Sequence, residues 1–183
     1  MPKLVLAYSG GLDTTTAIKW LSVEQGYDVI ALNIDVGKSR EQPVVESRGM
    51  AAGALKVRVI DGKEDFIRYF AFPALAAGAV YQDAYPLATA LARPLMAKLL
   101  VDVAHEEGAT AVAHGCTGKG NDQVRFDVGI QTLDPTLQIV APTRENAMAR
   151  DYQIEYLKQH GVDIPWAAKG PFSIDENLWG RSA

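Results

Sequence analysis

The stretch Lys3-Leu-Val-Leu-Ala-Tyr-Ser-Gly-Gly-Leu-Asp-Thr-Thr-Thr16 decides how this chain folds. Its apolar run, Leu4 to Ala7, is typical of a buried strand in a parallel sheet. The run stops at Ser9-Gly10-Gly11, and helical sequence begins again at Asp13. Two adjacent glycines let the backbone turn sharply and approach a ligand closely, because no Cβ stands in the way. The amides of the turn and of the first helical turn then converge on one point, which predicts a cradle for a phosphate group.

This turn is neither of the two common glycine-rich phosphate loops. No lysine directly precedes Thr14, and the two glycines are adjacent rather than spaced as in Gly-x-Gly-x-x-Gly. Ser9, Thr14 and Thr15 are expected to add hydroxyl groups at the same point. The string Ser9-Gly-Gly-Leu-Asp-Thr14 resembles the pyrophosphate loop of N-type ATP pyrophosphatases, which cleave ATP to AMP and pyrophosphate. The alternative is an ordinary tight turn that needs two glycines.

Apolar runs alternate with helical stretches along the rest of the chain. The predicted strands are Leu4–Tyr8, Val29–Ile34, Lys56–Ile60, Ala111–His114 and Gln138–Ala141. The predicted helices are Asp13–Gln25, Pro43–Ala52, Lys63–Phe70, Thr89–Glu107, Asn121–Thr132 and Asp151–Gln159. This order predicts an α/β fold with a doubly wound, parallel five-stranded sheet of the Rossmann-like, adenine nucleotide alpha hydrolase type. Ligands of such sheets lie beyond the carboxyl ends of the strands, which is where Ser9–Asp13 falls.

Length and composition narrow the class of protein. The 183 residues suffice for one medium domain, and we expect it to span residues 1–163. The net charge of −4 and the pI near 5.4 argue against a nucleic-acid partner, which would require a basic face. The single Cys116 excludes an internal disulfide framework. No signal peptide and no apolar run long enough for a bilayer are recognisable, so we expect a cytoplasmic protein without a membrane partner.

Residues 164–183 have no regular period, although they carry two tryptophans and a phenylalanine. Aromatic side chains in such a segment usually pack against something. We therefore expect an irregular tail that leads to a further domain, absent from this chain.

A second glycine-rich segment, His114-Gly-Cys-Thr-Gly-Lys-Gly-Asn-Asp122, directly follows a predicted strand. Its glycines offer another backbone cradle, which should lie beside the first at the strand ends. Thr117, Asn121 and Asp122 could bind a small polar ligand, and Asp122 could pair with an ammonium group. Alternatively, Asn121 and Asp122 only cap the next helix.

Several side chains near these turns allow two interpretations. Arg125 could hold a carboxylate of a ligand, or it could pair with Asp122. Tyr85 could cover a substrate or cap a turn. Thr89 and Arg93, which are spaced four apart, share one face of the predicted helix that follows. His114 is expected to be hydrogen-bonded inside the core rather than catalytic, and Cys116 is expected to fill space in the loop.

Three segments together resemble argininosuccinate synthases. They are Ala7-Tyr-Ser-Gly-Gly-Leu-Asp-Thr-Thr15, Tyr85-Pro-Leu-Ala-Thr-Ala-Leu-Ala-Arg-Pro94 and His114-Gly-Cys-Thr-Gly-Lys-Gly-Asn-Asp-Gln-Val-Arg-Phe126. The string Pro171-Phe-Ser-Ile-Asp-Glu-Asn-Leu178 is similar to a further motif of the same family. The resemblance implies condensation of citrulline with aspartate at the expense of ATP, which gives argininosuccinate, AMP and pyrophosphate.

The resemblance also assigns residues to ligands. It implies that ATP is bound by Ala7, Tyr8, Ser9, Gly10, Gly11, Leu12, Asp13, Thr14, Thr15, Ile34 and Gly115. It implies that aspartate is bound by Thr117, Asn121 and Asp122. It implies that citrulline is bound by Tyr85, Thr89, Asn121, Arg125, Ser173 and Ser182. Ser9, Asp13 and Asp122 are expected to be closest to the chemistry.

In the implied mechanism the ureido oxygen of citrulline attacks the α-phosphate of ATP and expels pyrophosphate, and the amine of aspartate then displaces AMP from citrullyl-AMP. Alignment and charge stabilisation suffice for this, without a covalent nucleophile. Mg²⁺ is expected on the triphosphate, with Asp13 as the candidate protein ligand. The family also implies a homotetramer. Two alternatives are another pyrophosphatase-loop enzyme, of the tRNA-thiolating or amidotransferase type, and a non-catalytic nucleotide-binding module.

Overall fold

A computed structural model gives the arrangement of the chain and describes residues 1–37, 42–146, 148–164 and 175–182. Its centre is a five-stranded parallel sheet with the strand order β3-β2-β1-β4-β5. The strands are β1 (Lys3–Ala7), β2 (Asp28–Asp35), β3 (Lys56–Asp61), β4 (Ala111–His114) and β5 (Gln138–Val140). The five predicted strands are confirmed, and each strand end agrees with the prediction or differs from it by one residue.

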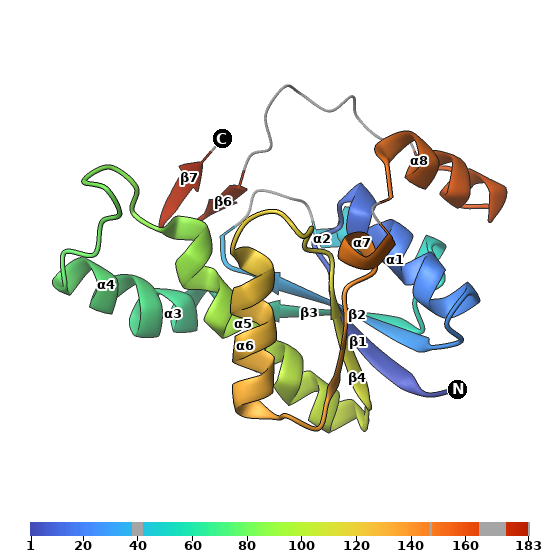
Figure 1. Cartoon of the computed structure of the whole chain (residues 1–183), viewed down its shortest axis with the longest axis horizontal. Coiled ribbons are helices and arrows are strands. Elements are labelled where there is room, and N and C mark those ends of the chain that lie inside the picture. The colour runs from blue at the N-terminus through green and yellow to red at the C-terminus, as the bar shows by residue number, and fades with distance from the viewer. Residues whose placement is uncertain (38–41, 147, 165–174, 183) are drawn as a thin grey trace.

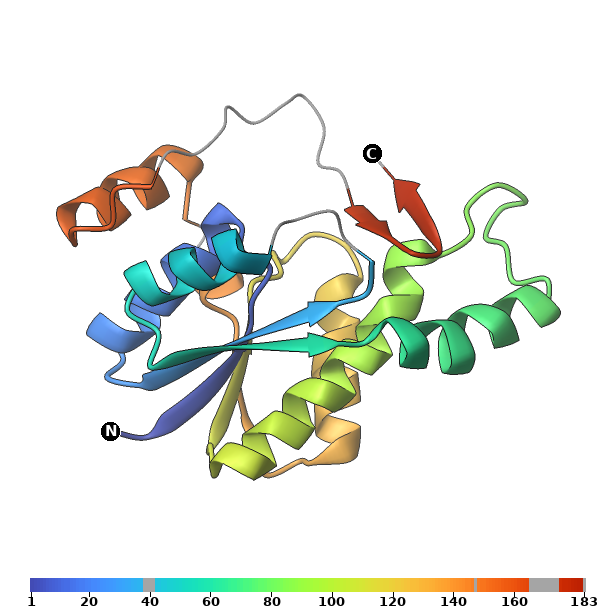
Figure 2. The ribbon, with the colours of Figure 1, turned by 180° about the vertical axis from the view of Figure 1, so that it is seen from behind.

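Helices cover both faces of the sheet (Figure 1). They are α1 (Leu12–Val23), α2 (Gln42–Ala51), α3 (Lys63–Phe66), the π-helical turn η1 (Ile67–Ala71), α4 (Phe72–Ala76), α5 (Ala88–Glu107), α6 (Asp122–Leu133), α7 (Pro142–Asn146) and α8 (Arg150–Gln159). Figure 2 shows α1 and α2 on one face and α5 and α6 on the other. The sheet is therefore doubly wound, as predicted.

Two apolar clusters follow from the alternation of side chains along the central strand. Leu4 and Leu6 of β1 pack with Ile18 and Leu21 of α1. Val5, which points to the opposite face, belongs to the cluster that α5 and α6 form. All three β1 side chains are completely buried. The prediction that the apolar run forms a strand covered on both faces is confirmed.

Three parts of the secondary structure differ from the prediction. The helix predicted to end at Phe70 continues through η1 into α4 and reaches Ala76. The short helix α7 was not predicted. The expectation of an irregular tail is wrong for its described end, because β6 (Asp175–Asn177) and β7 (Gly180–Ser182) form an antiparallel hairpin.

The hairpin is attached to the body of the domain by hydrogen bonds to distant segments. Asn177 Nδ2 donates to the carbonyl of Ala88 at 2.8 Å, and Trp179 Nε1 donates to the carbonyl of Pro86 at 2.8 Å. The Leu178 amide donates to the carbonyl of Val36 at 2.9 Å. Trp179 also packs on the apolar cluster around Phe66. Among the aromatic residues of the tail, this tryptophan therefore has the packing partner that the sequence suggested.

Within the described part of the chain, no helix combines the length and the apolar character needed to cross a bilayer.

Candidate functional site

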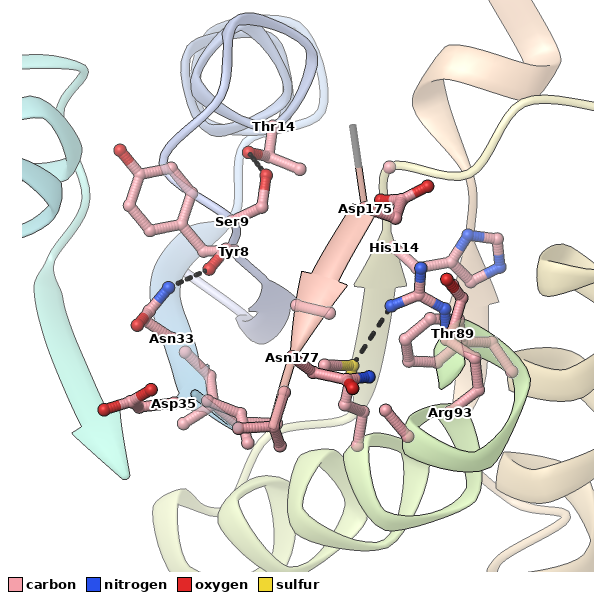
Figure 3. A pocket seen from close by; sticks show the side chains of 18 of the residues that line it. Tyr8, Ser9, Thr14, Asn33, Asp35, Thr89, Arg93, His114, Asp175 and Asn177 are labelled. Carbon is pink, nitrogen blue, oxygen red and sulfur yellow. Dashed lines mark hydrogen bonds between the residues drawn. The ribbon is translucent and has the colours of Figure 1, made fainter. Parts of the chain in front are cut away.

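A cavity of about 250 Å³ lies at the carboxyl edge of the sheet, where β1 and β4 are neighbours. The crossovers leave the sheet in opposite directions at this switch point, which is the usual ligand site of such folds. Figure 3 shows Ser9 and Thr14 on one side and Thr89 and Arg93 on the other, with Asp175 and Asn177 of β6 between them. The cavity therefore lies at the edge of the sheet where the sequence predicted a ligand site.

The first glycine turn joins β1 to α1 at the wall of this cavity. The N-cap of α1 is Gly11, and no side chain makes a capping hydrogen bond there. The first amides of a helix have no partner within the helix, so the start of this 12-residue helix is suited to an anion. Ser9 Oγ and Thr14 Oγ1 lie 3.2 Å apart, and both residues line the cavity.

Thr15 does not add its hydroxyl to the cavity as predicted. Its side chain is completely buried, and its Oγ1 donates to the carbonyl of Gly11 at 2.8 Å. The hydroxyl of Tyr8 lies 3.3 Å from the same Oγ1. Thr15 thus fixes the turn from inside the domain, because the helical rotation of about 100° per residue carries it away from Thr14.

Helix α2 shapes the same turn from outside. Gly10 has φ of +73°, and a Cβ at this position would lie 2.9 Å from Val45 Cγ2. Arg48 Nη1 donates to the carbonyl of Gly10 at 3.2 Å. A side chain larger than hydrogen fits neither the backbone conformation nor the space, which explains the glycine at this position.

The second glycine turn lies directly beside the first. Ala7 and His114 are paired in the register of β1 and β4. A Cβ at Gly115 would lie only 2.7 Å from Thr14 Cγ2. Gly115 and Cys116 line the cavity together with Thr14. The prediction that the two glycine turns meet is therefore confirmed.

Asp122 lies at the start of α6 between two arginines. Arg93 Nε and Nη2 donate to Asp122 Oδ2 at 3.0 and 2.8 Å, and Arg125 Nη1 donates to Oδ1 at 2.7 Å. The i−3 pair that the sequence offered as an alternative for Arg125 is thus formed. This cluster of one carboxylate and two guanidinium groups carries a net positive charge, and of the three groups only Arg93 lines the cavity.

Of the described residues predicted to contact the amino acids, Thr89 lines the cavity, whereas Tyr85, Thr117, Asn121 and Arg125 are not among the residues that line it. Asn121 is the N-cap of α6 but makes no side-chain capping bond, so capping does not explain it. Thr117 Oγ1 donates to the carbonyl of Lys119 at 3.4 Å. Tyr85 Oη accepts the Thr89 amide at 3.3 Å, which is the capping role given above as the alternative.

Two further predicted residues fall at the end of the chain. Ser173 lies outside the residues that the structure describes. Ser182 lies in β7, where its backbone pairs with that of Asp175.

The end of β2 supplies part of the cavity wall that was only partly predicted. Ile34, for which the resemblance implies a contact with ATP, lines the cavity together with Asn33 and Asp35. Asn33 Nδ2 donates to the Tyr8 carbonyl at 2.8 Å and so connects β2 to the first turn. Burial alone would raise the pKa of Asp35, but the ammonium group of Lys63 and the Gly37 amide bring it below its usual value.

Arg93, Met96 and the hairpin residues Asp175, Glu176 and Asn177 also line the cavity and were not predicted to contact a ligand. The spacing of Thr89 and Arg93 on one face of α5 was the available signal for Arg93.

His114 and Cys116 behave as the sequence suggested. His114 is completely buried and its Nε2 lies 2.9 Å from Asp127 Oδ1. Burial raises the pKa of the Cys116 thiol to about 11, so the sulfur is protonated at neutral pH and is a poor nucleophile.

The described residues hold no group of three His, Cys, Asp or Glu side chains that could bind a metal ion. Asp13 is exposed, and its Oδ1 accepts from Gln153 Nε2 at 2.9 Å.

Comparison with known proteins assigns the family. The family described as "Arginosuccinate synthase N-terminal HUP domain" matches residues 3–163. The chain belongs to the argininosuccinate synthase family. It is 57% identical over 180 residues to the argininosuccinate synthase of Oceanobacillus iheyensis, covering 98% of this chain and 43% of that protein. It is 56% identical over 180 residues to that of Dehalococcoides mccartyi, covering 98% and 44%.

The argininosuccinate synthase of Geobacillus thermodenitrificans is 57% identical over 181 residues, which cover 99% of this chain and 44% of that protein. The chain thus spans less than half the length of these curated relatives. A solved structure titled as a predicted subunit of tRNA methyltransferase from Methanocaldococcus jannaschii is similar with a TM-score of 0.58 and 17% identity, covering 87% of this chain and 75% of that one. At this identity the likeness shows a shared fold only.

Proposed function

We propose that this chain is the nucleotide-binding part of an ATP-dependent ligase that condenses citrulline with aspartate through citrullyl-AMP. The observation that carries the proposal is the contact between the two glycine turns, Thr14 against Gly115, at a single cavity. The family supports the reaction, and the meeting of the two glycine turns supports a nucleotide site at this cavity.

The first turn would hold the phosphates of ATP. The first amides of α1, the Ser9 hydroxyl and the Thr14 hydroxyl would donate hydrogen bonds to phosphate oxygens. Gly10 supports this assignment, because a Cβ there would push against Val45 and move the turn. Ile34 would contact the adenine ring, and the backbone of Gly115 would contact the nucleotide from the other side.

Magnesium would arrive with the triphosphate. The described residues provide no cage of carboxylates for it, so the phosphate oxygens would be its main ligands. Asp13 is the protein group that we propose for it, because its carboxylate is exposed next to the first turn. Magnesium would neutralise charge on the phosphates. The residues of this chain would bind ATP and the amino acids and align their reacting atoms.

The amino-acid substrates would lie on the α5 and α6 side of the cavity. Thr117, Asn121 and Asp122 would bind aspartate, with Asp122 facing its ammonium group. Tyr85, Thr89 and Arg125 would bind citrulline, together with Ser173 and Ser182. For this, Arg125 would exchange its bond to Asp122 for a substrate carboxylate, a change between two charge-assisted bonds of similar strength.

The reaction needs further residues in this interpretation. We propose that residues 1–163 form the ATP-binding domain, and that the additional length of the relatives contributes citrulline contacts and the tetramer. The 183-residue chain would then bind ATP with magnesium and form little argininosuccinate. The site carries no nucleic-acid partner in this proposal, and the protein would work in the cytoplasm.

Isothermal titration of the purified chain with ATP and MgCl₂ tests the proposal. We expect saturable binding that Ser9→Ala weakens several-fold, because one hydrogen bond to a charged phosphate is lost. Ser22→Ala is the matched control, since Ser22 Oγ bonds within α1, to the Lys19 carbonyl at 3.1 Å. Absence of ATP binding by the folded chain would refute the proposal, and efficient argininosuccinate formation would refute the need for further residues.

A further inference from the structure

A series of hydrogen bonds anchors the backbone of the second glycine turn to helices α6 and α7. The exposed side chains of the turn take no part in it. The series begins at the backbone of the turn, where the Cys116 amide donates to His114 Nδ1 at 3.3 Å. Because Nδ1 accepts, the proton of the neutral imidazole is on Nε2, which then donates to Asp127 Oδ1 at 2.9 Å. One buried ring thus connects the turn to helix α6.

Further hydrogen bonds lead from Asp127 back to the same turn. Arg144 of α7 donates through Nη1 to Asp127 Oδ2 at 2.8 Å and to Gln123 Oε1 at 3.1 Å. Gln123 Nε2 donates to the carbonyl of Gly118 at 2.8 Å. The hydrogen bonds therefore form a closed circuit from the start of the turn, through four side chains, to its middle. We call these four residues, His114, Gln123, Asp127 and Arg144, the support circuit.

Burial and charge fix the protonation states that the support circuit requires. His114 is completely buried and its ring stacks on Phe126 with centroids 5.3 Å apart. Burial lowers the pKa of His114 more than the Asp127 carboxylate raises it, so the ring is neutral at neutral pH. Burial would raise the pKa of Asp127, but Arg144 and His114 lower it below its usual value, so Asp127 is ionised.

We propose that the support circuit positions the second glycine turn for ligand binding. Several of the ligand-binding groups proposed above lie in residues 115–121, yet this segment belongs to no helix or strand. Without the circuit, the peptide between His114 and Gly118 would lose both its donor and its acceptor anchor. The four residues are positioning residues, because they act on the ligand through the turn.

This inference rests on the proposed function, since it assumes that the turn binds the nucleotide. The support circuit should also protect the Cys116 amide from hydrogen exchange when no ligand is present. The two statements can be tested separately on the 183-residue chain.

The variant Asp127→Asn interrupts the circuit at its centre, and Asp134→Asn is its matched control. Asp134 also accepts from a histidine, His105 Nε2 at 2.7 Å, but at the opposite end of α6. We expect Asp127→Asn to increase the hydrogen-exchange rate of the Cys116 amide about tenfold without ligand, the ratio for one hydrogen bond supported by a charge. We expect the dissociation constant of magnesium ATP to rise about tenfold as well. Asp134→Asn should change neither quantity.

Arg144→Met provides a second interruption if Asp127→Asn does not fold. Its side chain is 29% exposed, and the variant leaves the His114–Asp127 pair in place. Nitrogen NMR of the unmodified chain should show the neutral Nε2–H tautomer of His114. A different tautomer, an unchanged Cys116 exchange rate in both variants, or an equal effect of Asp134→Asn would overturn the inference. If the unmodified chain does not bind ATP while Cys116 exchange responds as expected, the proposed function fails and the support circuit stands.

Discussion

The contact between the two glycine turns can be tested by adding one methyl group and removing another. Gly115→Ala places a Cβ 2.7 Å from Thr14 Cγ2, whereas ordinary contacts between such atoms begin near 3.4 Å. Gly115 does not have a positive φ, so alanine is compatible with its backbone and the cost comes from the contact alone. Thr14 cannot simply rotate away, because its Oγ1 lies 3.2 Å from Ser9 Oγ and is bonded to the Gly11 carbonyl at 3.3 Å.

The magnitude follows from the physics of overpacked sites. An extra methyl group in a closely packed place costs about 1–3 kcal/mol, partly offset by about 0.4–1 kcal/mol from the less flexible unfolded chain. Thr14→Ser removes the opposing methyl group and costs about 1 kcal/mol of buried apolar contact by itself. In the double variant the new methyl group occupies the vacated space, so Gly115→Ala should then cost almost nothing.

Urea unfolding of the four proteins, followed by circular dichroism, gives the free energies of unfolding for this double-mutant cycle. We expect a coupling energy of about 1–3 kcal/mol between the two substitutions. ATP affinity measured on the same four proteins should follow the same pattern, since the contact joins both turns. If Gly115→Ala destabilises the chain equally with and without the Thr14→Ser substitution, the two turns do not touch as described and the single-cavity argument fails.

Three further outcomes are expected. Gly10→Ala should lower the free energy of unfolding by about 2–3 kcal/mol, because the new Cβ combines a positive φ with a 2.9 Å contact to Val45. Urea unfolding measures this loss, and a value below about 0.5 kcal/mol would contradict the expectation. Cys116, with a thiol pKa raised to about 11, should react with iodoacetamide at about pH 8 roughly a hundredfold more slowly in the folded chain than in urea. Its rate should still rise between about pH 9 and 10, since only the thiolate reacts, and a plateau near pH 9 would be inconsistent with the raised pKa. Trp179→Phe removes the bond to the Pro86 carbonyl and should cost about 1 kcal/mol in thermal unfolding, and a Trp179→Phe chain as stable as the unmodified one would show that this bond does not hold the hairpin.

The parts of the fold that the sequence predicted are those set by short-range patterns. Leu4 to Leu6 are apolar without alternation because both faces of their strand are covered, and this pattern is visible in the sequence itself. Gly108 ends α5 with φ of +63°, which is the usual role of a glycine after a helix. Each of these features depends on a few consecutive residues.

The parts that were missed depend on contacts between distant residues. The helix predicted to end at Phe70 continues through the wide turn η1 into α4, where Pro73 is tolerated near the helix start. The hairpin at Asp175–Ser182 has little strand propensity, and it is held by Val36, Pro86 and Ala88. Such contacts cannot be predicted from the local sequence.

The same division applies to the site. The meeting of the two glycine turns was predicted, because each turn directly follows a strand and the carboxyl ends of parallel strands lie at one edge of the sheet. The pairing of Arg93 with Asp122 joins residues 29 positions apart and was missed. Thr15 was misplaced because three consecutive threonines look alike in sequence, whereas the helix directs one toward the cavity and the next toward Tyr8.

The attachment of the hairpin also has a consequence for synthesis on the ribosome. All five strands of the sheet and their covering helices precede His160, so the sheet can assemble while the hairpin is still inside the exit tunnel. The nascent domain would therefore present its nucleotide cavity without the wall that Asp175, Glu176 and Asn177 provide. The cavity wall is completed only after the hairpin has left the tunnel, when Trp179 reaches the carbonyl of Pro86.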